Sequence, residues 1–541
     1  MTDKRAIAGR TPPAANAARP LHVAIIGAGI AGLGAAYQLK HIAQASEQDI
    51  TYAVYESDGR IGGQLWTDRP TLPCGRTAIA DGGSDSYLSS KHAAMARVAR
   101  LLGIEDQLIG TDDSTKQTFI VKGGALVPLP DGIMLFAPTK VLPLITTKLY
   151  SWPAKFRMAA DVVLPRKKLA PNEDESIGSL VRRRLGRECL DRLAEPLVGG
   201  INGSDPKTMS TRAVYPMLLA MEQQYGSLIR GFLAQRKKAE AARAASSGTV
   251  SRTFFSSCRK GLDDFTNALA AAIGEQHVHT STPVTAIKRT AEGRYQLSIR
   301  REAATGIVRH SGIICDYASC ADAAEGLSEV LYADAVIITA PAWVAGELLA
   351  DLTPPAAEIL SDIPHSSCAT IITAFDSADA PFARNWHGIL APGIEDQKVT
   401  GISLMSSKWS GRAPADSVLL RGFVGGARDS ATPYLPDDEL IELARSTYVT
   451  LLGLQPQAQP TYAKVFRFPR AMPQYIVGHL QRMDVLNQHL AQQKGLALGG
   501  AAYTGVGVPN CLESGERAAL KVLADLNIVL PKEQTPQKQA R

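Results

Sequence analysis

Two short glycine-rich turns lie near opposite ends of the chain, and their spacing suits phosphate binding. The first turn has Gly27, Gly29 and Gly32 in the order G-x-G-x-x-G, between an apolar run over residues 22–26 and a predicted helix over 31–40. In this order the first glycine permits a tight turn, the second lets the backbone approach a pyrophosphate, and the third lets helix and strand pack closely. We therefore predict a dinucleotide site. Its expected contacts are Gly27, Gly29, Ile30, Ala31 and Gly32.

A carboxylate closes the next predicted strand, residues 51–55. Glu56 stands where an acidic side chain hydrogen-bonds a ribose hydroxyl and repels a 2′-phosphate. After it, Arg60 can neutralise phosphate charge, and two adjacent glycines can bring further amides to it. This spacing favours FAD over NAD, and the alternative is a surface turn. The expected contacts in this segment are Glu56, Ser57, Arg60, Gly62, Gly63 and Gln64.

The second turn lies near the end of the sequence. Gly499, Gly500, Gly505 and Gly507 precede a predicted helix over residues 511–526, whose dipole can stabilise negative charge on a reduced flavin ring. Between the two ends, a predicted strand at Val284 can cover the adenine, and a buried strand over 333–341 ends in a turn. The remaining expected cofactor contacts are Gly83, Ser84, Val284, Thr339, Ala340, Pro341, Gly500, Gly507 and Val508.

Composition narrows the possible partners. The 541 residues are 45% hydrophobic and 20% charged, enough for a sizeable core and for two or three domains or one large interleaved domain. The formal net charge of +6, without basic clusters joined to aromatics, gives no support for a nucleic-acid partner. It does suit an acidic small molecule or an anionic membrane surface. Seven cysteines without a C-x-x-C motif predict no metal site and a reducing, cytoplasmic location.

The patterns predict an α/β (α+β) fold in which a Rossmann-type FAD-binding domain is interleaved with two other parts. The FAD-binding domain is expected at 21–92, 253–345 and 491–530. The other expected parts are a helical substrate subdomain at 93–235, a loop insertion at 236–252 and a substrate-binding mixed or antiparallel sheet at 346–490. We expect a disordered tail at 1–20 and a second tail at 531–541.

One segment of the predicted helical subdomain raises the question of membrane contact. Residues 133–152 combine apolar and aromatic side chains with Lys140 and Lys148. This mixture suits the bilayer interface, and it suits a helix that lines a ligand pocket equally well. No run reaches the ~18 apolar residues that span a bilayer. Any membrane contact is therefore expected to be peripheral, on the inner face of the cell membrane.

Taken together, these segments resemble the protoporphyrinogen oxidase family, including its bacterial branch that acts on coproporphyrinogen III, within the monoamine-oxidase-like flavoproteins. The likeness covers residues 20–528, and its most specific phrases lie at 175–186, 195–205, 472–479 and 505–511. It implies non-covalent FAD and removal of six electrons from a porphyrinogen in three steps, with O2 as acceptor and hydrogen peroxide as product. Each step implies transfer of a hydride to the flavin and loss of a pyrrole proton. A homodimer or a ferrochelatase-type partner stays open.

The resemblance also implies two catalytic candidates. Gly200 matches a family glycine whose carbonyl faces the macrocycle, and the alternative is a glycine that ends a helix. Asp85 matches a position near flavin and substrate, where a carboxylate can bind pyrrole N–H groups or accept their protons. Its alternative is ordinary turn chemistry. We expect Lys408 and Trp409 to pack at a sheet edge and His479 to be a buried structural histidine with satisfied hydrogen bonds, rather than a proton relay.

One departure from the family limits the choice of substrate. Some members bind a propionate with an arginine soon after a Leu-Gly phrase, where this chain has Glu105 and Asp106. The propionate partner is thus unassigned, and coproporphyrinogen III and protoporphyrinogen IX both stay open. A flavin amine oxidase or carotenoid desaturase is the first alternative, although the final turn offers Val508 and Pro509 instead of an aromatic cage. The second alternative is a flavoprotein that binds porphyrin without turnover.

Overall fold

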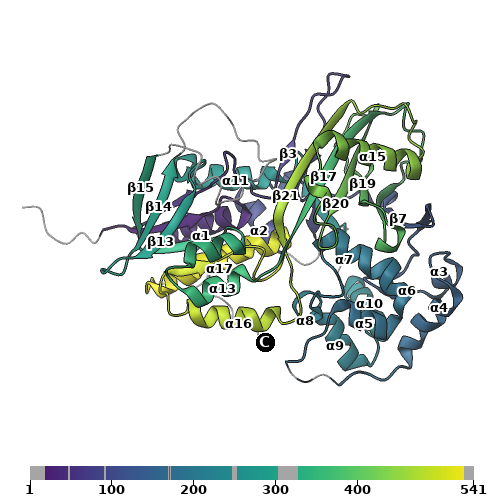
Figure 1. Cartoon of the computed structure of the whole chain (residues 1–541), viewed down its shortest axis with the longest axis horizontal. Helices are drawn as coiled ribbons and strands as arrows, with labels where there is room; N and C mark the ends of the chain where they lie inside the picture. Colours follow the sequence, from purple (N-terminus) through teal and green to yellow (C-terminus); the bar gives the residue numbers. More distant parts are fainter. Residues whose placement is uncertain are drawn as a thin grey trace, which may run out of the picture.

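The computed structural model describes residues 19–46, 49–89, 93–168, 170, 172–245, 253–301 and 327–528. Apart from residues 19 and 20, the two predicted tails lie outside the described residues, and so does 246–252 of the predicted loop. Figure 1 shows a sheet covered by helices on the left, a second sheet at the upper right and a group of helices at the lower right.

A five-stranded parallel sheet forms the base of the left half. Its strand order is β12-β2-β1-β16-β22. Apolar side chains on both faces of β1 are buried, as expected for a parallel sheet between two layers. The carboxyl ends of all five strands lie at one edge, and β1 pairs with β2 on one side and β16 on the other. Open parallel sheets generally bind ligands at such an edge. The strands are β1 (Leu21–Ile26), β2 (Ile50–Tyr55), β12 (Val278–His279), β16 (Ala335–Ile338) and β22 (Leu496–Leu498).

Helices from distant parts of the chain cover both faces of this sheet. One face is packed by α1 (Ile30–Ser46), α2 (Ala93–Leu101), α11 (Asp263–Ile273) and α17 (Val508–Asp525). The other is packed by α12 (Ala342–Leu349), α13 (Pro354–Ser361), α16 (His479–Leu490) and the antiparallel sheet of β13 (Val284–Arg289), β14 (Tyr295–Arg301) and β15 (Leu327–Ala333). Helices α13 and α16, which lie between the predicted domain boundaries at 346 and 490, pack in the same core as the parallel sheet. The domain boundaries themselves stay a prediction.

The second sheet confirms the predicted antiparallel pattern and extends it. Its order is β21-β17-β20-β19-β18-β7-β8, and within this sheet, as far as the structure describes it, only the β18–β7 pair is parallel. Strands β7 and β8 come from the segment predicted as helical. They form a short hairpin at the edge of the sheet, and such a hairpin leaves only a weak strand pattern among the helical patterns around it. The strands are β7 (Gln117–Lys122), β8 (Ala125–Pro128), β17 (His365–Asp376), β18 (Trp386–Leu390), β19 (Val399–Leu404), β20 (Ser417–Gly425) and β21 (Tyr462–Pro473), with α15 (Asp437–Leu452) packed against them.

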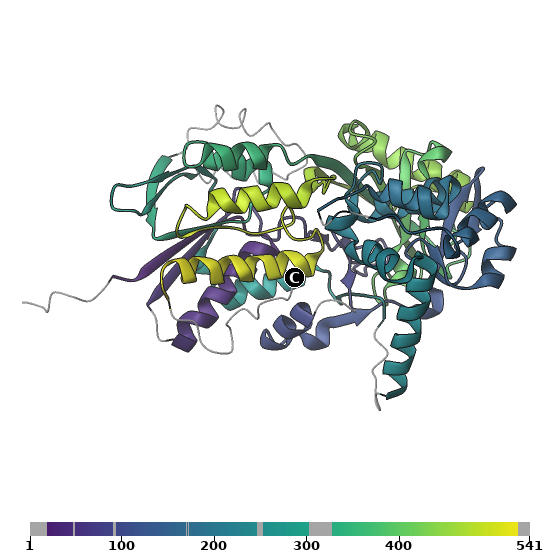
Figure 2. The ribbon, with the colours of Figure 1, turned by 90° about the horizontal axis from the view of Figure 1, so that it is seen from below.

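The helical region forms the lower right of Figure 1. Its helices include α3 (Val141–Thr146), α4 (Trp152–Ala159), α5 (Ile177–Leu185), α7 (Glu195–Asn202), α9 (Pro216–Tyr225) and α10 (Leu228–Ala245). In Figure 2 the teal helix α10 projects from the body. It continues to Ala245, into the segment predicted as a loop, because this run of Ala, Lys, Arg and Glu has high helix propensity and an Arg236–Glu240 pair one turn apart.

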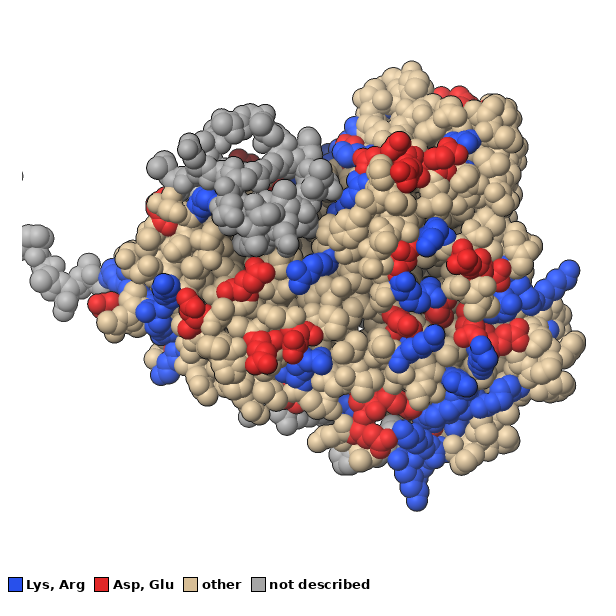
Figure 3. Space-filling view, viewed as in Figure 1, with Lys and Arg blue, Asp and Glu red and all other residues tan. Residues whose placement is uncertain are grey.

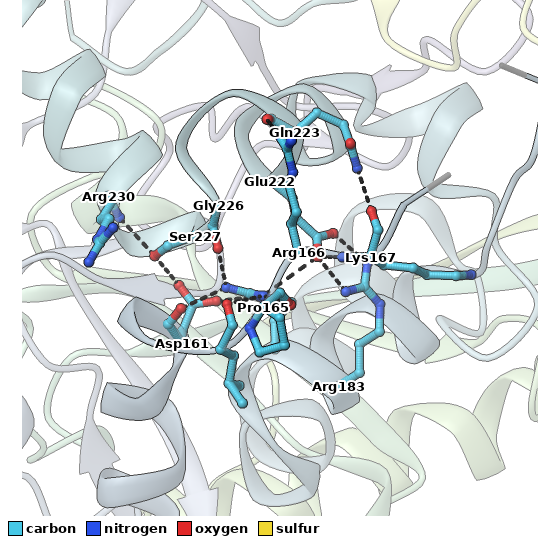
Figure 4. Close-up of polar contacts among 12 residues, drawn as sticks. Asp161, Pro165, Arg166, Lys167, Arg183, Glu222, Gln223, Gly226, Ser227 and Arg230 are labelled. Carbon is cyan, nitrogen blue, oxygen red and sulfur yellow. Dashed lines mark hydrogen bonds and ion pairs between the residues drawn. The ribbon is translucent and has the colours of Figure 1, made fainter. Parts of the chain in front are cut away.

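A buried network of charges ties this region together (Figure 4). Arg184 in α5 is 1% exposed and donates from Nε to Asp161 at 2.5 Å. The same carboxylate accepts from the Ser227 hydroxyl at 2.5 Å and the Ile229 amide at 3.0 Å, at the start of α10. Neighbouring Arg183 binds Glu222 of α9. The network therefore fixes α5, α9, α10 and the chain around residue 161 relative to one another.

None of the described helices combines the length and the apolar character needed to cross a bilayer. The described cysteines, Cys74, Cys189, Cys258, Cys368 and Cys511, are all free thiols.

Candidate active site

The turn after β1 has the geometry that its glycines predict. Gly27 has a φ of +102°, and its amide donates to the Tyr55 carbonyl at 2.8 Å. A Cβ on Gly32 would lie 1.9 Å from the Gly27 carbonyl oxygen, so only glycine lets α1 pack this closely. A Cβ on Gly29 would meet nothing within 4 Å. The backbone at Gly29 is therefore open to a ligand, whereas Gly32 is needed for packing, and Ile30 and Ala31 begin α1.

Glu56 lies directly after β2 and joins two parts of the site. Its carboxylate accepts hydrogen bonds from the Ala28 amide at 2.7 Å, the Asp58 amide at 2.9 Å and the Ser57 hydroxyl at 3.2 Å. Burial raises the pKa of Glu56, and the two amide hydrogen bonds oppose that rise. The side chain thus ties the glycine turn to the following loop. The ribose contact stays a prediction.

The Arg60 guanidinium is occupied by its own loop. It donates to the Gly63 carbonyl at 2.6 Å and the Ile61 carbonyl at 3.1 Å, and lies 4.3 Å from the centre of the Trp66 ring. Its observed role is to brace the loop, so phosphate neutralisation by Arg60 stays a prediction. The loop returns to the first turn: the Gly62 amide donates to the Ala28 carbonyl at 2.9 Å, and Gly29 and Gly62 form a bridge.

Further predicted contacts come from three other segments of the chain. The Gln64 side-chain amide donates to the Ala471 carbonyl in β21 at 2.7 Å. Gly83 packs so closely that a Cβ would lie 1.7 Å from the Gln64 carbonyl oxygen, and the neighbouring Ser84 is exposed. Val284 is buried in β13, two residues after Thr282, whose amide donates to the Glu56 carbonyl at 2.8 Å. These segments thus contact one another or the loop after β2, and their contact with FAD stays a prediction.

The second glycine turn meets the first across the sheet edge. The Thr339 hydroxyl, just after β16, hydrogen-bonds the Ile26 carbonyl at 2.9 Å and the Gly27 carbonyl at 3.1 Å. Gly500 follows β22, and a Cβ there would lie 3.5 Å from the Thr339 carbonyl oxygen. Gly507 is the N-cap of α17, and its first residue Val508 is buried. Ala340 and Pro341 lead into α12, with Pro341 as its N-cap.

Tyr475 supports this turn and was missed as a site residue. Its hydroxyl donates to the Ala501 carbonyl at 2.6 Å and accepts from the Gly505 amide at 2.7 Å, so it spans the turn. His479 stacks on Tyr475 with ring centres 4.0 Å apart. It is fully buried, as predicted, but among the described residues neither ring nitrogen has a hydrogen-bond partner. Burial lowers the pKa of His479 to about 4, so the ring is neutral near pH 7.

Asp85 is not a free carboxylate. It lies 2.8 Å from Lys408 Nζ, accepts from the Trp409 indole at 3.1 Å and lies 3.8 Å from Arg421. Burial would raise the pKa of Asp85, but the charges of Lys408 and Arg421 and the hydrogen bonds outweigh it and hold that pKa well below its ordinary value. The prediction that Lys408 and Trp409 only pack at a sheet edge is wrong, because Asp85, 323 positions away, recruits both.

A second ion pair anchors the other end of the same loop. Asp81 lies 2.9 Å from Arg412 and accepts from the Thr67 hydroxyl at 2.5 Å and the Leu262 amide at 3.0 Å. Arg421 in β20 donates to the carbonyl oxygens of Gly82 and Gly83, the first at 3.1 Å. Arg412 and Arg421 were also missed, although an arginine within the apolar run of residues 417–424 was a detectable signal.

The comparison with protein families shows to which family the chain belongs. A model described as flavin containing amine oxidoreductase matches residues 30–523. The chain belongs to the flavin-containing amine oxidoreductase family. It is similar to the coproporphyrinogen III oxidase of Staphylococcus aureus, with 30% identity over 93% of this chain and 99% of that protein, and to that of Bacillus subtilis, with 28% identity over 93% and 98%. The crystal structure of a candidate protoporphyrinogen oxidase from Exiguobacterium sp. 255-15 superimposes with a TM-score of 0.76 at 27% identity, over 94% of this chain and 99% of that one.

As a member of this family the chain uses FAD, and its described residues fit that cofactor. Gly29 leaves an open backbone, while Gly63 follows it so closely that a Cβ would lie 3.3 Å from the Gly29 Cα. Two glycines in this arrangement leave room for a pyrophosphate beside the backbone, and a larger side chain at either position would occupy that room.

Gly200, the family-matched candidate near the macrocycle, lies in the last turn of α7. The helix ends at Asn202, and its C-cap is Gly203 with a φ of +56°. Gly203, and not Gly200, is therefore the helix-ending glycine. Gly200 is exposed, and a Cβ there would lie 3.2 Å from the Leu390 side chain. It lines a pocket together with Glu195, Gly199, Thr400 and Arg428. Exposure and close packing together favour glycine here.

Proposed function

We propose that this chain is an oxygen-dependent oxidase that converts coproporphyrinogen III to coproporphyrin III in haem biosynthesis. The observation that carries the proposal is the near full-length match to two bacterial proteins of that name, because it covers 93% of this chain and 98% or 99% of theirs. When bound, FAD supplies the hydride acceptor and passes the electrons to O2. The chain's own residues bind FAD, orient the substrate beside it and shield both from water.

Each described residue has a separate part in this proposal. Glu56 holds the ribose, Gly29 and Gly63 admit the pyrophosphate, and Tyr475 keeps the turn between Gly500 and Gly507 in shape. Gly200 leaves the side facing the macrocycle flat, which suits a wide planar ring system.

For Asp85 we propose a positioning role in place of proton acceptance. A carboxylate held in ion pairs by Lys408 and Arg421 binds a proton poorly, because protonation would leave buried cations without a partner. The carboxylate instead fixes the loop that carries Gly83 and Ser84.

The test is anaerobic mixing of the purified flavoprotein with coproporphyrinogen III, protoporphyrinogen IX and a panel of amines. Bleaching of the flavin by coproporphyrinogen III, followed on aeration by porphyrin fluorescence and peroxide, supports the proposal. Faster bleaching by protoporphyrinogen IX would reassign the substrate. Bleaching by amines alone would overturn the porphyrinogen assignment, and tight porphyrin binding without bleaching would favour a carrier.

We further propose a peripheral membrane contact through α3 and α4. Val141, Leu142 and Phe156 are each at least 70% exposed, and Trp152 is 57% exposed with Lys155 over its ring at 4.6 Å. Figure 3 shows Lys and Arg side chains gathered over the helical region. Aromatic and apolar side chains beside cations suit an anionic bilayer surface. The exposed cations of this region include Lys148, Arg166, Lys168, Arg182 and Arg187.

Sedimentation with lipid vesicles tests this contact. The protein should sediment with vesicles that contain phosphatidylglycerol and stay in solution with phosphatidylcholine alone. The double variant Leu142→Ser with Phe156→Ser should lose most of the binding, while Leu101→Ser, a matched change at a 52% exposed position in α2, should keep it. Equal binding by all three proteins would refute the assigned surface. The cytoplasmic location, the homodimer and the ferrochelatase-type partner stay predictions.

A further inference from the structure

Five buried charged side chains lie behind the loop of Gly83 and Ser84. They are Asp81, Asp85, Lys408, Arg412 and Arg421, and we name them the buried charge group. None of the five side chains is more than 13% exposed. Three cations face two carboxylates, so these five side chains together carry one net positive charge in an interior of low dielectric. Asp264, whose side chain is 27% exposed, lies outside the group, where Arg69 pairs with it. A charge in such surroundings acts over a longer range than one in water.

We propose that the buried charge group raises the reduction potential of the bound FAD, and that Arg421 is the positioning residue that holds the loop of Gly83 and Ser84 against the flavin. The inference rests on the proposed function only in taking this loop as a flavin contact. It adds a role for residues that neither the fold nor the family match assigns.

The loop lies next to the cofactor turn by a continuous series of contacts. Gly29 bridges to Gly62, and the Leu65 amide donates to the Gly62 carbonyl at 2.9 Å. The Gly82 amide then donates to the Trp66 carbonyl at 2.8 Å, and Gly83 packs on the Gln64 carbonyl. The loop therefore continues the surface that begins at the pyrophosphate turn.

Arg421 fixes this loop from behind. It donates to two successive carbonyl oxygens, and hydrogen bonds from a charged donor are about twice as strong as neutral ones. Its Nε has no hydrogen-bond partner among the described residues, and its guanidinium also lies 4.6 Å from the Phe423 ring centre. Burial lowers the pKa of Arg421, with Asp85 opposing that shift.

A net positive charge in this position favours a reduced flavin that carries negative charge, by the same electrostatics that stabilise an oxyanion. A purely mechanical clamp predicts something different. If the group only held the loop in place, removing either partner of an ion pair would weaken FAD binding. If the group acts through its charge, the shift in the midpoint potential of FAD has opposite signs for removal of a cation and removal of a carboxylate.

The sign of this shift is tested by measuring the midpoint potential of bound FAD in Lys408→Met, Asp85→Asn and the double variant. We expect the potential to fall in Lys408→Met and rise in Asp85→Asn. It should return close to the wild-type value in the double variant, because that change removes one charge of each sign. Shifts of the two single variants in the same direction, or no shift in either, would overturn the proposal.

Arg421 is tested with Arg421→Lys and Arg421→Met. The lysine variant keeps the charge but not the two-carbonyl geometry, so its potential should stay near wild type while FAD affinity drops several-fold. In the methionine variant both the midpoint potential of bound FAD and the affinity for FAD should fall. Wild-type affinity for FAD in both variants would refute the positioning role. If Arg421→Met does not fold, the lysine variant decides. Arg445→Met, which removes an exposed ion pair on α15, is the matched control and should change neither quantity.

These measurements use FAD and a redox dye without porphyrinogen. A wild-type protein that binds FAD but fails to oxidise porphyrinogens would disprove the proposed function, and the comparison of potentials would still decide this inference.

Discussion

Gly29 and Gly32 lie in the same turn but have different surroundings, which separates ligand binding from folding. We expect Gly29→Ala to lower FAD affinity at least about tenfold, a loss of about 1.4 kcal/mol, and to leave the Tm of the apoprotein unchanged, because its Cβ meets no protein atom within 4 Å. Gly32→Ala should lower both, since its Cβ would lie 1.9 Å from a carbonyl oxygen.

Thermal melts of the apoproteins and FAD titrations check this difference. Gly388→Ala in β18 is the control, because a Cβ there would lie 3.7 Å from its nearest neighbour, an ordinary contact. A lower apoprotein Tm in Gly29→Ala would contradict the open backbone described for that residue.

Tyr475 offers a test that removes one oxygen atom. In Tyr475→Phe the Gly505 amide and the Ala501 carbonyl lose their shared partner, which should cost about 1–3 kcal/mol of turn stability and appear as weaker FAD binding. Tyr150→Phe is the matched control, because among the described residues the buried Tyr150 hydroxyl has no hydrogen-bond partner. Fluorescence titration with FAD measures both variants. Unchanged affinity in Tyr475→Phe would show that the turn keeps its shape without this hydroxyl.

His479 should make stability depend on pH. Its pKa is about 4 in the folded protein and near 6.5 in the unfolded chain, so between these values only the unfolded state binds the proton. Stability is therefore lost as the pH falls from 6.5 to 4, by about 3 kcal/mol from this group. His479→Phe keeps a ring against Tyr475 and should remove that part of the loss. Denaturant unfolding at pH 7 and pH 4 measures it, and equal losses in both proteins would contradict the assignment.

At the scale of elements, the buried network of the helical region should control local stability. Arg184→Met leaves Asp161 buried without its cation, which should cost about 3–5 kcal/mol of unfolding free energy. Arg236→Met removes only an exposed ion pair on α10 and should cost less than about 1 kcal/mol. Denaturant titration compares the two. A similar small cost in both would show that the buried pair does not hold the helices together.

The elements also show what local patterns can predict. The parallel sheet and both glycine turns follow from short runs, because strand, turn and helix signals lie next to each other in the sequence. Strands β7 and β8 were missed since a short hairpin at a sheet edge leaves a weak pattern. The partners of Asp85 could not be predicted, because Lys408 and Trp409 reach it only through the folding of a separate sheet. For the same reason the hydrogen bonds of Tyr475 were not foreseen.

At the scale of the whole molecule, FAD should link the stability of distant segments. At a concentration about 100 times its Kd, FAD should stabilise the protein by about 2.7 kcal/mol, since the unfolded chain has no such site. The Tm should rise with FAD concentration in the wild type and little at the same concentrations in Gly29→Ala. An FAD-independent Tm in the wild-type protein would contradict a site built from both glycine turns.

The order of strands in the parallel sheet has a consequence for how the protein is made. Strands β1 and β2 leave the ribosome first, whereas β22 and α17 emerge at the far end of synthesis. Until then the sheet lacks one outer strand, and the helix that packs α1 through Gly515 is missing. We therefore expect tight FAD binding only once β22 and α17 have been made and have packed onto the sheet.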